Sequence, residues 1–466
     1  MSQMSQAFYG FVDSLWVSKT IGKDGMTVFG AVFVVDFIAA SFANYFGAGL
    51  TARTSYLFGK KMVNECSQLY VDFIRICLFT GILVPLLVLP IVKPIIMWFG
   101  ADQKIADMSF IYMIPSTVGS FITFLFMIGC GLIQATGRST LYGVIQLVAF
   151  VLNMLVFDPL LLYYLKTPMW GASLATILSQ LFPAIFVTIR IFSGKYAIQP
   201  KMKMFLKPIS KETWAAMSVG FSSWIASVSL TIPQVLMQKY FNNASLAIGE
   251  YNTMIMIWAV MEKLYLITGG ICVAFGQSTL PSVSFAFGAN RLNRVLRIGL
   301  HALWVSTMLS CAFAGAIILF PRKIAKIWSS DPHYLNWAEK TIPVMFYCAP
   351  FFAIQYIIPA VLQGMKKVFS STALSILTLL IPLPVFSSLL YFTNKRDPIR
   401  IIYTFTCNDI YSFIMCILFS IIPFKELWIA EPSADAISQV KSNYTDRDEL
   451  LFNGSDVDRV PNDIPI

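Results

Sequence analysis

Long apolar runs recur along almost the whole chain, and short polar stretches separate them. A helix that spans a bilayer needs roughly 20 apolar residues, and the alternating pattern typical of membrane β-barrels is not seen. The pattern therefore predicts an all-α polytopic membrane protein with about twelve transmembrane helices. Their expected ranges are 4–18, 27–50, 72–97, 108–134, 139–164, 169–192, 214–238, 250–280, 298–320, 341–363, 370–392 and 401–423.

Composition and charge agree with this class. Of 466 residues, 57% are hydrophobic and 12% are charged, whereas about a quarter of a soluble domain is charged. A net charge of +10 is also typical of nucleic-acid binding, but here the basic residues lie in short loops, where they set membrane topology. The densest basic cluster, within residues 190–211, follows the sixth predicted helix. We therefore expect the even-numbered loops and both termini to face the cytosol, and no nucleic-acid partner.

The two halves of the chain resemble each other. The second and eighth predicted helices end in "TSYLFGKKMVNE" and "VSFAFGANRLNR", where Gly59 and Gly288 are 229 positions apart. The fourth and tenth end in "LIQATGR" and "VLQGMKK", where Gln134 and Gln363 are also 229 positions apart. A shared offset in corresponding helices indicates two pseudo-symmetric six-helix lobes, and the alternative is chance similarity between apolar helices. Repeats of this kind are common in secondary transporters, with the binding site near the midplane.

This duplication divides the chain into four parts. They are an N-terminal lobe at 1–193, a cytosolic linker at 194–213, a C-terminal lobe at 214–424 and a tail at 425–466. Hydrophobicity falls sharply in the tail, which we expect to be disordered, acidic and cytosolic. Within the tail, Asp446, Leu450 and Leu451 fit an acidic dileucine sorting pattern that would contact a clathrin adaptor. The plasma membrane and an endosomal or vacuolar membrane both remain open, and no cleavable signal peptide is visible.

Acids inside apolar helices are the main candidates for chemistry, because an ionisable group in a bilayer is costly. Asp13 lies in "AFYGFVDSLWVSK", Asp158 in "VLNMLVFDPLLLYY", and Asp36 within the second predicted helix. Asn153 and Asp158 would lie about 140° apart around a regular helix, unless a kink or π-bulge realigns them. The alternative role for each acid is to cap a helix or pair with a cation.

The remaining polar candidates are weaker. Gln134 in the first half, and Glu262 and Asp409 in the second, are secondary candidates for either structure or transport. Eight cysteines and two histidines show no metal-ligand or disulfide spacing. No nucleophile elbow or phosphate-binding loop occurs, so we expect neither an enzyme nor a cofactor.

Several stretches together carry a family resemblance: "FVDSLWVSKTIG", "IQATGRST", "NMLVFDP" followed by "WGASLAT", and "GQSTLPSVSFAFGANRLNRV". They resemble motifs of the multidrug and toxic compound extrusion (MATE) transporters, especially the DinF-like branch, and the last stretch is the most specific. The resemblance spans both halves. It implies a twelve-helix, two-lobed antiporter that exports organic, usually cationic, compounds in exchange for protons or sodium ions.

The resemblance also implies an ion site in the N-terminal lobe. By position, the site would consist of Asp13, Asn153, Asp158 and Thr176, with Tyr112 nearby. A flippase of lipids or lipid-linked oligosaccharides, from the same broader superfamily, is the alternative function, although it would call for cations inside the lobes. A membrane-embedded enzyme would need clustered His, Cys or Ser, and a receptor or channel would not need two matched halves.

The chain departs from the family pattern at three points. The front of the first helix is nearly missing, which fits a truncated gene model, a processed form or a genuine variant. Asn153 and Asp158 are five positions apart, where the DinF-like branch usually has four. The seventh predicted helix, "VGFSSWIASVSL", has no acid, which weighs against coupling through an acid of that helix.

Overall fold

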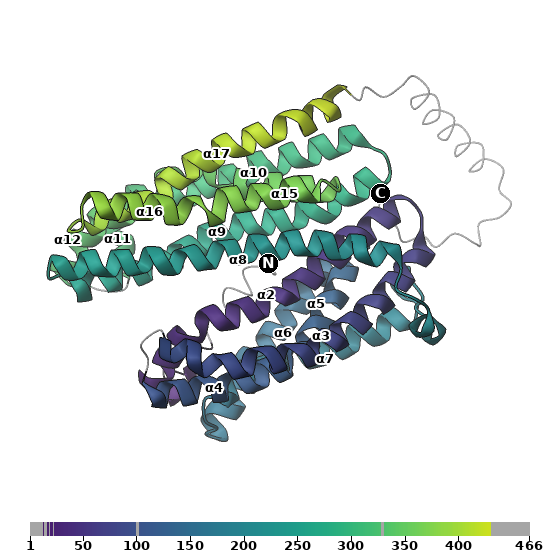
Figure 1. Cartoon of the computed structure of the whole chain (residues 1–466), viewed down its shortest axis with the longest axis horizontal. Helices are drawn as coiled ribbons and strands as arrows, with labels where there is room; N and C mark the ends of the chain where they lie inside the picture. The colour runs from purple at the N-terminus through teal and green to yellow at the C-terminus, as the bar shows by residue number, and fades with distance from the viewer. Residues whose placement is uncertain are drawn as a thin grey trace.

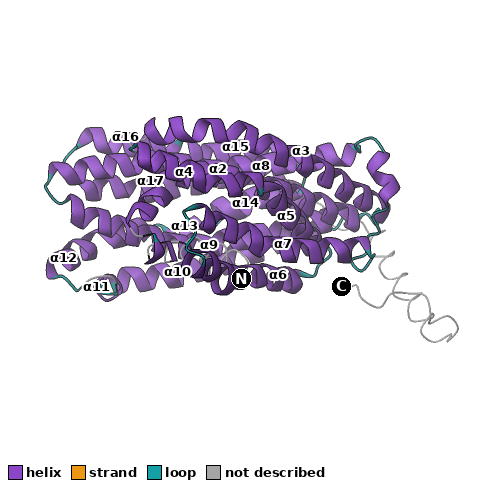
Figure 2. Cartoon of the chain, turned by 90° about the horizontal axis from the view of Figure 1, so that it is seen from below, coloured by secondary structure: helices purple, strands orange, loops and turns teal. Residues whose placement is uncertain are grey.

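The computed structural model describes residues 13, 16–17, 19–21, 23–98, 102–327 and 330–429. Most of the first predicted helix, and the sorting pattern at Asp446, Leu450 and Leu451, lie outside these residues. The described chain is helical, and Figure 2 shows helices and loops but no strand within it. Most helices run along the long axis of the molecule, as in a membrane bundle.

The first half of the chain forms one helical bundle, coloured purple to blue in Figure 1. Its helices are α2 (Lys23–Gly59), α3 (Val63–Trp98), α4 (Gln103–Val118), α5 (Ser120–Ala135), α6 (Ser139–Leu152) and α7 (Trp170–Phe192). Two π-helical segments, η1 (Asn153–Phe157) and η2 (Pro159–Tyr164), continue α6, so that one span runs over Ser139–Tyr164. This bundle is the N-terminal lobe.

The second half forms the C-terminal lobe, after a short 3₁₀ segment, η3 (Met202–Leu206), in the linker. Its elements are α8 (Lys211–Ala247), α9 (Tyr251–Gly288), α10 (Leu292–Leu319), α11 (Pro321–Ala325), α12 (Pro332–Thr341), η4 (Ile342–Phe346), α13 (Ala349–Phe352), α14 (Ile354–Gly364), α15 (Val368–Ser375), η5 (Ile376–Leu380), α16 (Pro382–Thr393) and α17 (Pro398–Ile429). Helix α8 therefore takes up the last three residues of the linker expected at 194–213. Helix α17 continues past residue 424, where the C-terminal lobe was expected to end.

Two of the helices expected to be continuous are broken. The range 108–134 is divided between α4 and α5, which bend by 45° at Gly119. The range 341–363 is divided in the same way, with a 43° bend between Pro332–Phe346 and Ala349–Gly364. A proline lies near each bend: Pro115 removes a backbone hydrogen bond inside α4, and Pro350 lies in the first turn of α13, where a helix readily begins.

The lengths and surfaces of these helices match a membrane environment. Among the described residues, eight helices are long and apolar enough to span a bilayer, and ten if each bent pair counts as one span. On α3, Phe79, Ile82 and Leu86 form an apolar stripe in which each side chain is 66–69% exposed. Acids and amides such as Asp158 and Gln355 are buried instead. Large apolar side chains outside and polar ones inside are the arrangement expected of a multi-pass membrane protein.

The two lobes meet along α2, which packs against α8 and α9. Figure 1 shows the lobes converging at the end that holds η3 and diverging towards α4 and α12. We call the converging end the linker end and define it by Gly59, η3, Glu212 and Gly288. Each lobe has its own large apolar core, and a smaller apolar cluster of Ala52, Val219, Leu280 and Ala360 joins the two lobes.

The lobes approach each other closely at a reciprocal glycine contact at the linker end. A Cβ atom on Gly59 would press on the Phe285 carbonyl oxygen, and one on Gly288 would press on the Tyr56 carbonyl oxygen. Tyr56 and Phe285 are separated by the same 229 positions as the two glycines. Gly59 thus contacts Phe285 in the same way as their counterparts, Gly288 and Tyr56, contact each other. A contact that occurs twice with the two partners exchanged is typical of a twofold interface. The geometry therefore supports a duplicated six-helix unit.

Candidate functional site

The structure brings two carboxyl groups together inside the N-terminal lobe. Asp13 comes from the first helix and Asp158 from the junction between η1 and η2, and they are 7% and 0% exposed. Their carboxyl groups lie within hydrogen-bonding reach of each other. Thr176 Oγ1 on α7 donates a hydrogen bond to Asp13 Oδ2 at 3.3 Å. Three separate helices thus converge on one buried polar centre.

A π-helical turn places Asn153 beside Asp158. The Asp158 backbone N–H donates to the Asn153 carbonyl oxygen, an i→i+5 bond that closes the η1 turn. Asn153 Nδ2 then donates to Asp158 Oδ1 at 3.4 Å. A regular α-helix would have separated these side chains by about 140°. The wider turn compensates for the five-residue spacing, so the departure from the family pattern does not separate the pair.

Three oxygen atoms of this cluster have no hydrogen-bond donor. Among the described residues, Asp13 Oδ1, Asn153 Oδ1 and Asp158 Oδ2 are buried and without a partner. A buried acceptor left in this state costs about 1–3 kcal/mol, and more when the group is charged. Oxygen atoms alone are the ligands that hard cations prefer, and a carboxylate also binds a proton. The centre therefore suits reversible binding of a small cation.

Tyr112 and Asp36 border the same centre. Tyr112 on α4 is buried, and its ring contacts Phe29 edge-on with centroids 5.4 Å apart. Its carbonyl oxygen accepts a hydrogen bond from Ser173 Oγ at 2.6 Å, which ties α4 to α7. Asp36 on α2 is half-buried and lies close enough to Asp13 and Tyr112 to interact with both electrostatically. All five residues expected at the ion site, together with Asp36, thus lie in one region.

The other three candidates lie elsewhere. Glu262 on α9 is exposed and accepts a hydrogen bond from Trp258 Nε1 at 2.7 Å. Asp409 on α17 is buried inside the C-terminal lobe, where its carboxyl is hydrogen-bonded by Gln355. Gln134 on α5 borders a small pocket between the lobes. None of the three belongs to the N-terminal cluster.

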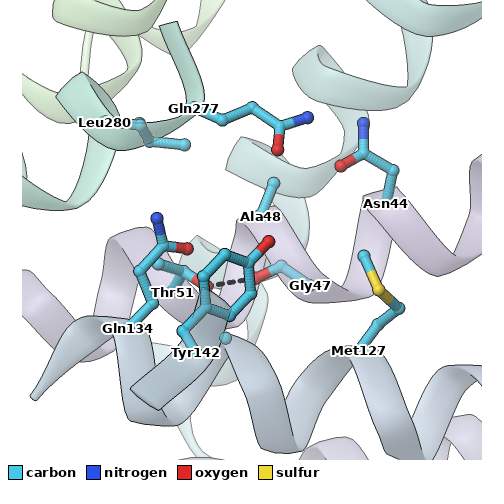
Figure 3. A pocket seen from close by; sticks show the side chains of 10 residues that line it. Asn44, Gly47, Ala48, Thr51, Met127, Gln134, Tyr142, Gln277 and Leu280 are labelled. Atoms are coloured by element: carbon cyan, nitrogen blue, oxygen red, sulfur yellow. Dashed lines mark hydrogen bonds between the residues drawn. The ribbon is translucent and has the colours of Figure 1, made fainter. Parts of the chain in front are cut away.

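The pocket between the lobes is uncharged. Figure 3 shows the amides of Asn44, Gln134 and Gln277 around it, with the Thr51 hydroxyl bonded to the Gly47 carbonyl oxygen at 2.7 Å. Its lining residues are Asn44, Gly47, Ala48, Thr51, Met127, Gly131, Gln134, Tyr142, Gln277 and Leu280. Its free space is about 40 Å³, enough for a few water molecules but not for a drug-sized solute. The lobes are therefore closed at this depth.

Polar contacts that the sequence pattern does not predict reinforce the closure between the lobes at the linker end. Arg53 on α2 forms an ion pair with Glu212 on α8, and both side chains are largely buried. Lys366, which follows α14, places Nζ 3.6 Å from the centroid of the Tyr56 ring. In the sequence, Arg53 near the end of an apolar helix indicates that a polar partner lies close to it. Sequence alone does not identify its partner, 159 positions away.

Comparison with known proteins gives consistent matches over most of the chain. The MatE family model matches residues 1–159 and 253–386. The FAD transporter of Shewanella oneidensis is 20% identical over 345 residues, covering 72% of this chain and 74% of that protein. The multidrug export protein MepA of Staphylococcus aureus is 20% identical over 380 residues, covering 81% and 82%.

The fold is also that of a solved transporter. A structure described as the outward-facing conformation of a multidrug resistance MATE family transporter of the MOP superfamily matches with a TM-score of 0.81. The two chains are 18% identical, and the match covers 92% of this chain and 94% of the other. This likeness confirms the predicted fold class, an all-α membrane protein of two pseudo-symmetric lobes.

Proposed function

The chain belongs to the MatE family of membrane transporters, and from that premise we propose that it is a secondary antiporter. In this proposal it exports organic, mostly cationic, compounds in exchange for protons or sodium ions. The resemblance inferred from the sequence is thus confirmed at the level of the family, while the DinF-like branch stays a prediction. The family matches favour export over the alternative of a lipid flippase.

The pairing of Asp13 with Asp158 is the observation that carries this proposal. Two ionised carboxylates in contact inside a bilayer repel each other, and little water is present to screen them. A proton or a sodium ion bound between them removes this repulsion and satisfies the oxygens that lack donors. The cluster therefore gains a cation readily in one state of the protein and releases it when the surrounding helices rearrange.

Exchange follows if the cation and the substrate favour different states. A ligand shifts a conformational equilibrium only by its differential affinity for the two states. The Asp13 site touches α7 and the π-helical part of the fifth span, so binding there biases how these helices pack. The half-buried Asp36 and the exposed Glu262 supply negative charge that would attract an organic cation.

Orientation and location form part of the same proposal. From the basic loops we infer that the linker end and both termini face the cytosol. The closed linker end would then seal the protein from the cytosol, so that its lobes open to the opposite face. The plasma membrane and an endosomal or vacuolar membrane both fit, with the tail motif at Asp446, Leu450 and Leu451 as a contact for a clathrin adaptor.

Transport in proteoliposomes tests the proposal. A proton gradient and a sodium gradient are imposed separately, and efflux of a fluorescent organic cation is followed for wild type and Asp13→Asn. We expect one gradient to drive efflux and the substitution to abolish it. Asp107→Asn is the matched control, because Asp107 is partly exposed and pairs with Lys93 at 2.6 Å outside the cluster. Folded wild-type protein that gives no efflux under either gradient would refute the proposal.

A further inference from the structure

The C-terminal lobe also contains a buried acid that the mechanism above does not use. Asp409 lies on α17, 11 positions after the helix begins at Pro398, which places it about 16 Å along a span. The residue is 5% exposed. Among the described residues, neither Lys, Arg nor His forms an ion pair with it. An ionised carboxylate without a cation is costly at this depth, so its presence needs an explanation.

The groups around Asp409 are neutral and polar. Gln355 on α14 hydrogen-bonds its carboxyl and is itself 2% exposed. The Gln355 Oε1 atom is buried beside this contact and has no partner. Tyr265 on α9 and Tyr356 on α14 are hydrogen-bonded to each other and lie within electrostatic range of Asp409. Asp409 thus faces one amide and a pair of hydroxyls.

Among the described residues, thiols also lie near Asp409. Cys272 on α9 and Cys348 before α13 lie within electrostatic range of the carboxyl, and Cys407 is on the same helix. None of these groups is a cation. Tyr265 and Tyr356 are both half-buried.

The duplication of the chain gives an independent reason to link this position to ion binding. The offset of 229 positions relates Asp409 to Gln180 on α7, one helical turn after Thr176, which contacts Asp13. The Gln180 Oε1 atom is also buried without a partner. The corresponding spans both contain a π-helical segment, η1 in the first lobe and η5 in the second. Ser412, one turn after Asp409, donates to the Thr378 carbonyl oxygen within η5 at 3.1 Å.

We propose that Asp409, with Gln355 and the Tyr265–Tyr356 pair, is a second proton-binding site, located in the C-terminal lobe. A proton fits better than a metal cation, because this centre has one carboxyl whereas the N-terminal cluster has two. Protonation neutralises Asp409 without further ligands, and the reverse step returns the proton to water. The role in transport rests on the antiport proposed above, whereas proton binding by Asp409 does not.

Infrared difference spectroscopy tests proton binding directly. Wild-type protein in lipid nanodiscs is titrated with pH while the carbonyl stretch of protonated carboxyl groups is recorded. We expect one titrating band to vanish in Asp409→Asn and to persist in Asp13→Asn and Asp36→Asn. Asparagine matches aspartate in shape and keeps a partner for Gln355, so the variant should fold. Gln355→Leu should displace the pH midpoint of the same band, while Gln134→Leu should not.

Two results would overturn the inference. One is that Asp409→Asn leaves every titrating band intact. The other is that the wild-type band assigned to Asp409 is present but does not change with pH. Transport provides the second readout, since Asp409→Asn should lower the number of protons moved per substrate by about half. If Asp13→Asn fails to affect transport while the Asp409 band still titrates, the proposed N-terminal coupling fails and the second site stands.

Discussion

Closure at the linker end depends on Gly59, and replacing it with alanine should open that end. The added Cβ would press on the Phe285 carbonyl oxygen and lie 2.9 Å from the Ala289 nitrogen. Both atoms belong to the backbone of the facing helix end, so no side chain can rotate out of the way. The helices must therefore separate, or the closed state must lose population.

The expected size of the effect follows from the cost of overpacking. Forcing an extra methyl group into a tight contact costs about 1–3 kcal/mol, and every 1.4 kcal/mol changes an equilibrium about tenfold. Gly59→Ala should therefore lower the ratio of closed to open molecules by about 5- to 150-fold. Gly270→Ala is the matched control, because Gly270 lies on α9 and a Cβ there meets nothing within 4 Å.

Distances between spin labels measure this ratio. Labels are attached to cysteines introduced at Lys61 and Asn293, two exposed positions on opposite lobes at the linker end. The partly exposed Cys311, Cys348 and Cys407 are first replaced by serine. We expect a longer-distance population in Gly59→Ala but not in Gly270→Ala. Identical distance distributions in wild type and Gly59→Ala would show that the glycine contact does not control closure.

Three further predictions concern other contacts. Charge reversal at either member of the Arg53–Glu212 pair should open the linker end, because like charges would then face each other across the lobes. The double exchange, Arg53→Glu with Glu212→Arg, should restore closure in the same distance measurement. Asp72 is fully buried and accepts hydrogen bonds from Ser210 N and Thr213 Oγ1, both at 2.9 Å. Asp72→Asn should therefore lower the free energy of unfolding by about 1–3 kcal/mol and release the linker. Limited proteolysis at the exposed Lys201 and Lys203 checks this, and unchanged cleavage rates would contradict it. The His333 imidazole, 2.8 Å from Glu250, lowers the pKa of that carboxyl, and the carboxylate raises the pKa of His333. The stabilisation from the pair should therefore be present between the ordinary Glu pKa of about 4.3 and the pH at which His333 loses its proton, and it should be lost as pH falls below that window. The difference in Tm between wild type and Glu250→Gln should therefore shrink on acidification, and a constant difference would count against the pair.

The sequence was informative about the N-terminal site because costly residues stand out in apolar helices. Asp13, Asp158 and the neighbouring Asn153 were recognisable as polar residues in apolar helices, and the family resemblance added Thr176 and Tyr112 to the expected ion site. The sequence could not settle the angle between Asn153 and Asp158, because η1 forms one wide turn whose position depends on packing around Pro159. The status of Asp36 and Asp409 was equally open, since each depends on groups from other helices.

The amino-acid pattern is enough to assign the class of membrane protein and to predict the approximate spans and the duplication. It could do so because the transfer of each residue into a bilayer is a local property, summed along one helix. The positions of the bends, the meeting of the acids, and the contacts of Gly59 with Gly288 and of Arg53 with Glu212 depend on how the helices pack. Those contacts join residues between 145 and 229 positions apart, and the rotation of each helix about its axis is fixed by its neighbours rather than by its own sequence.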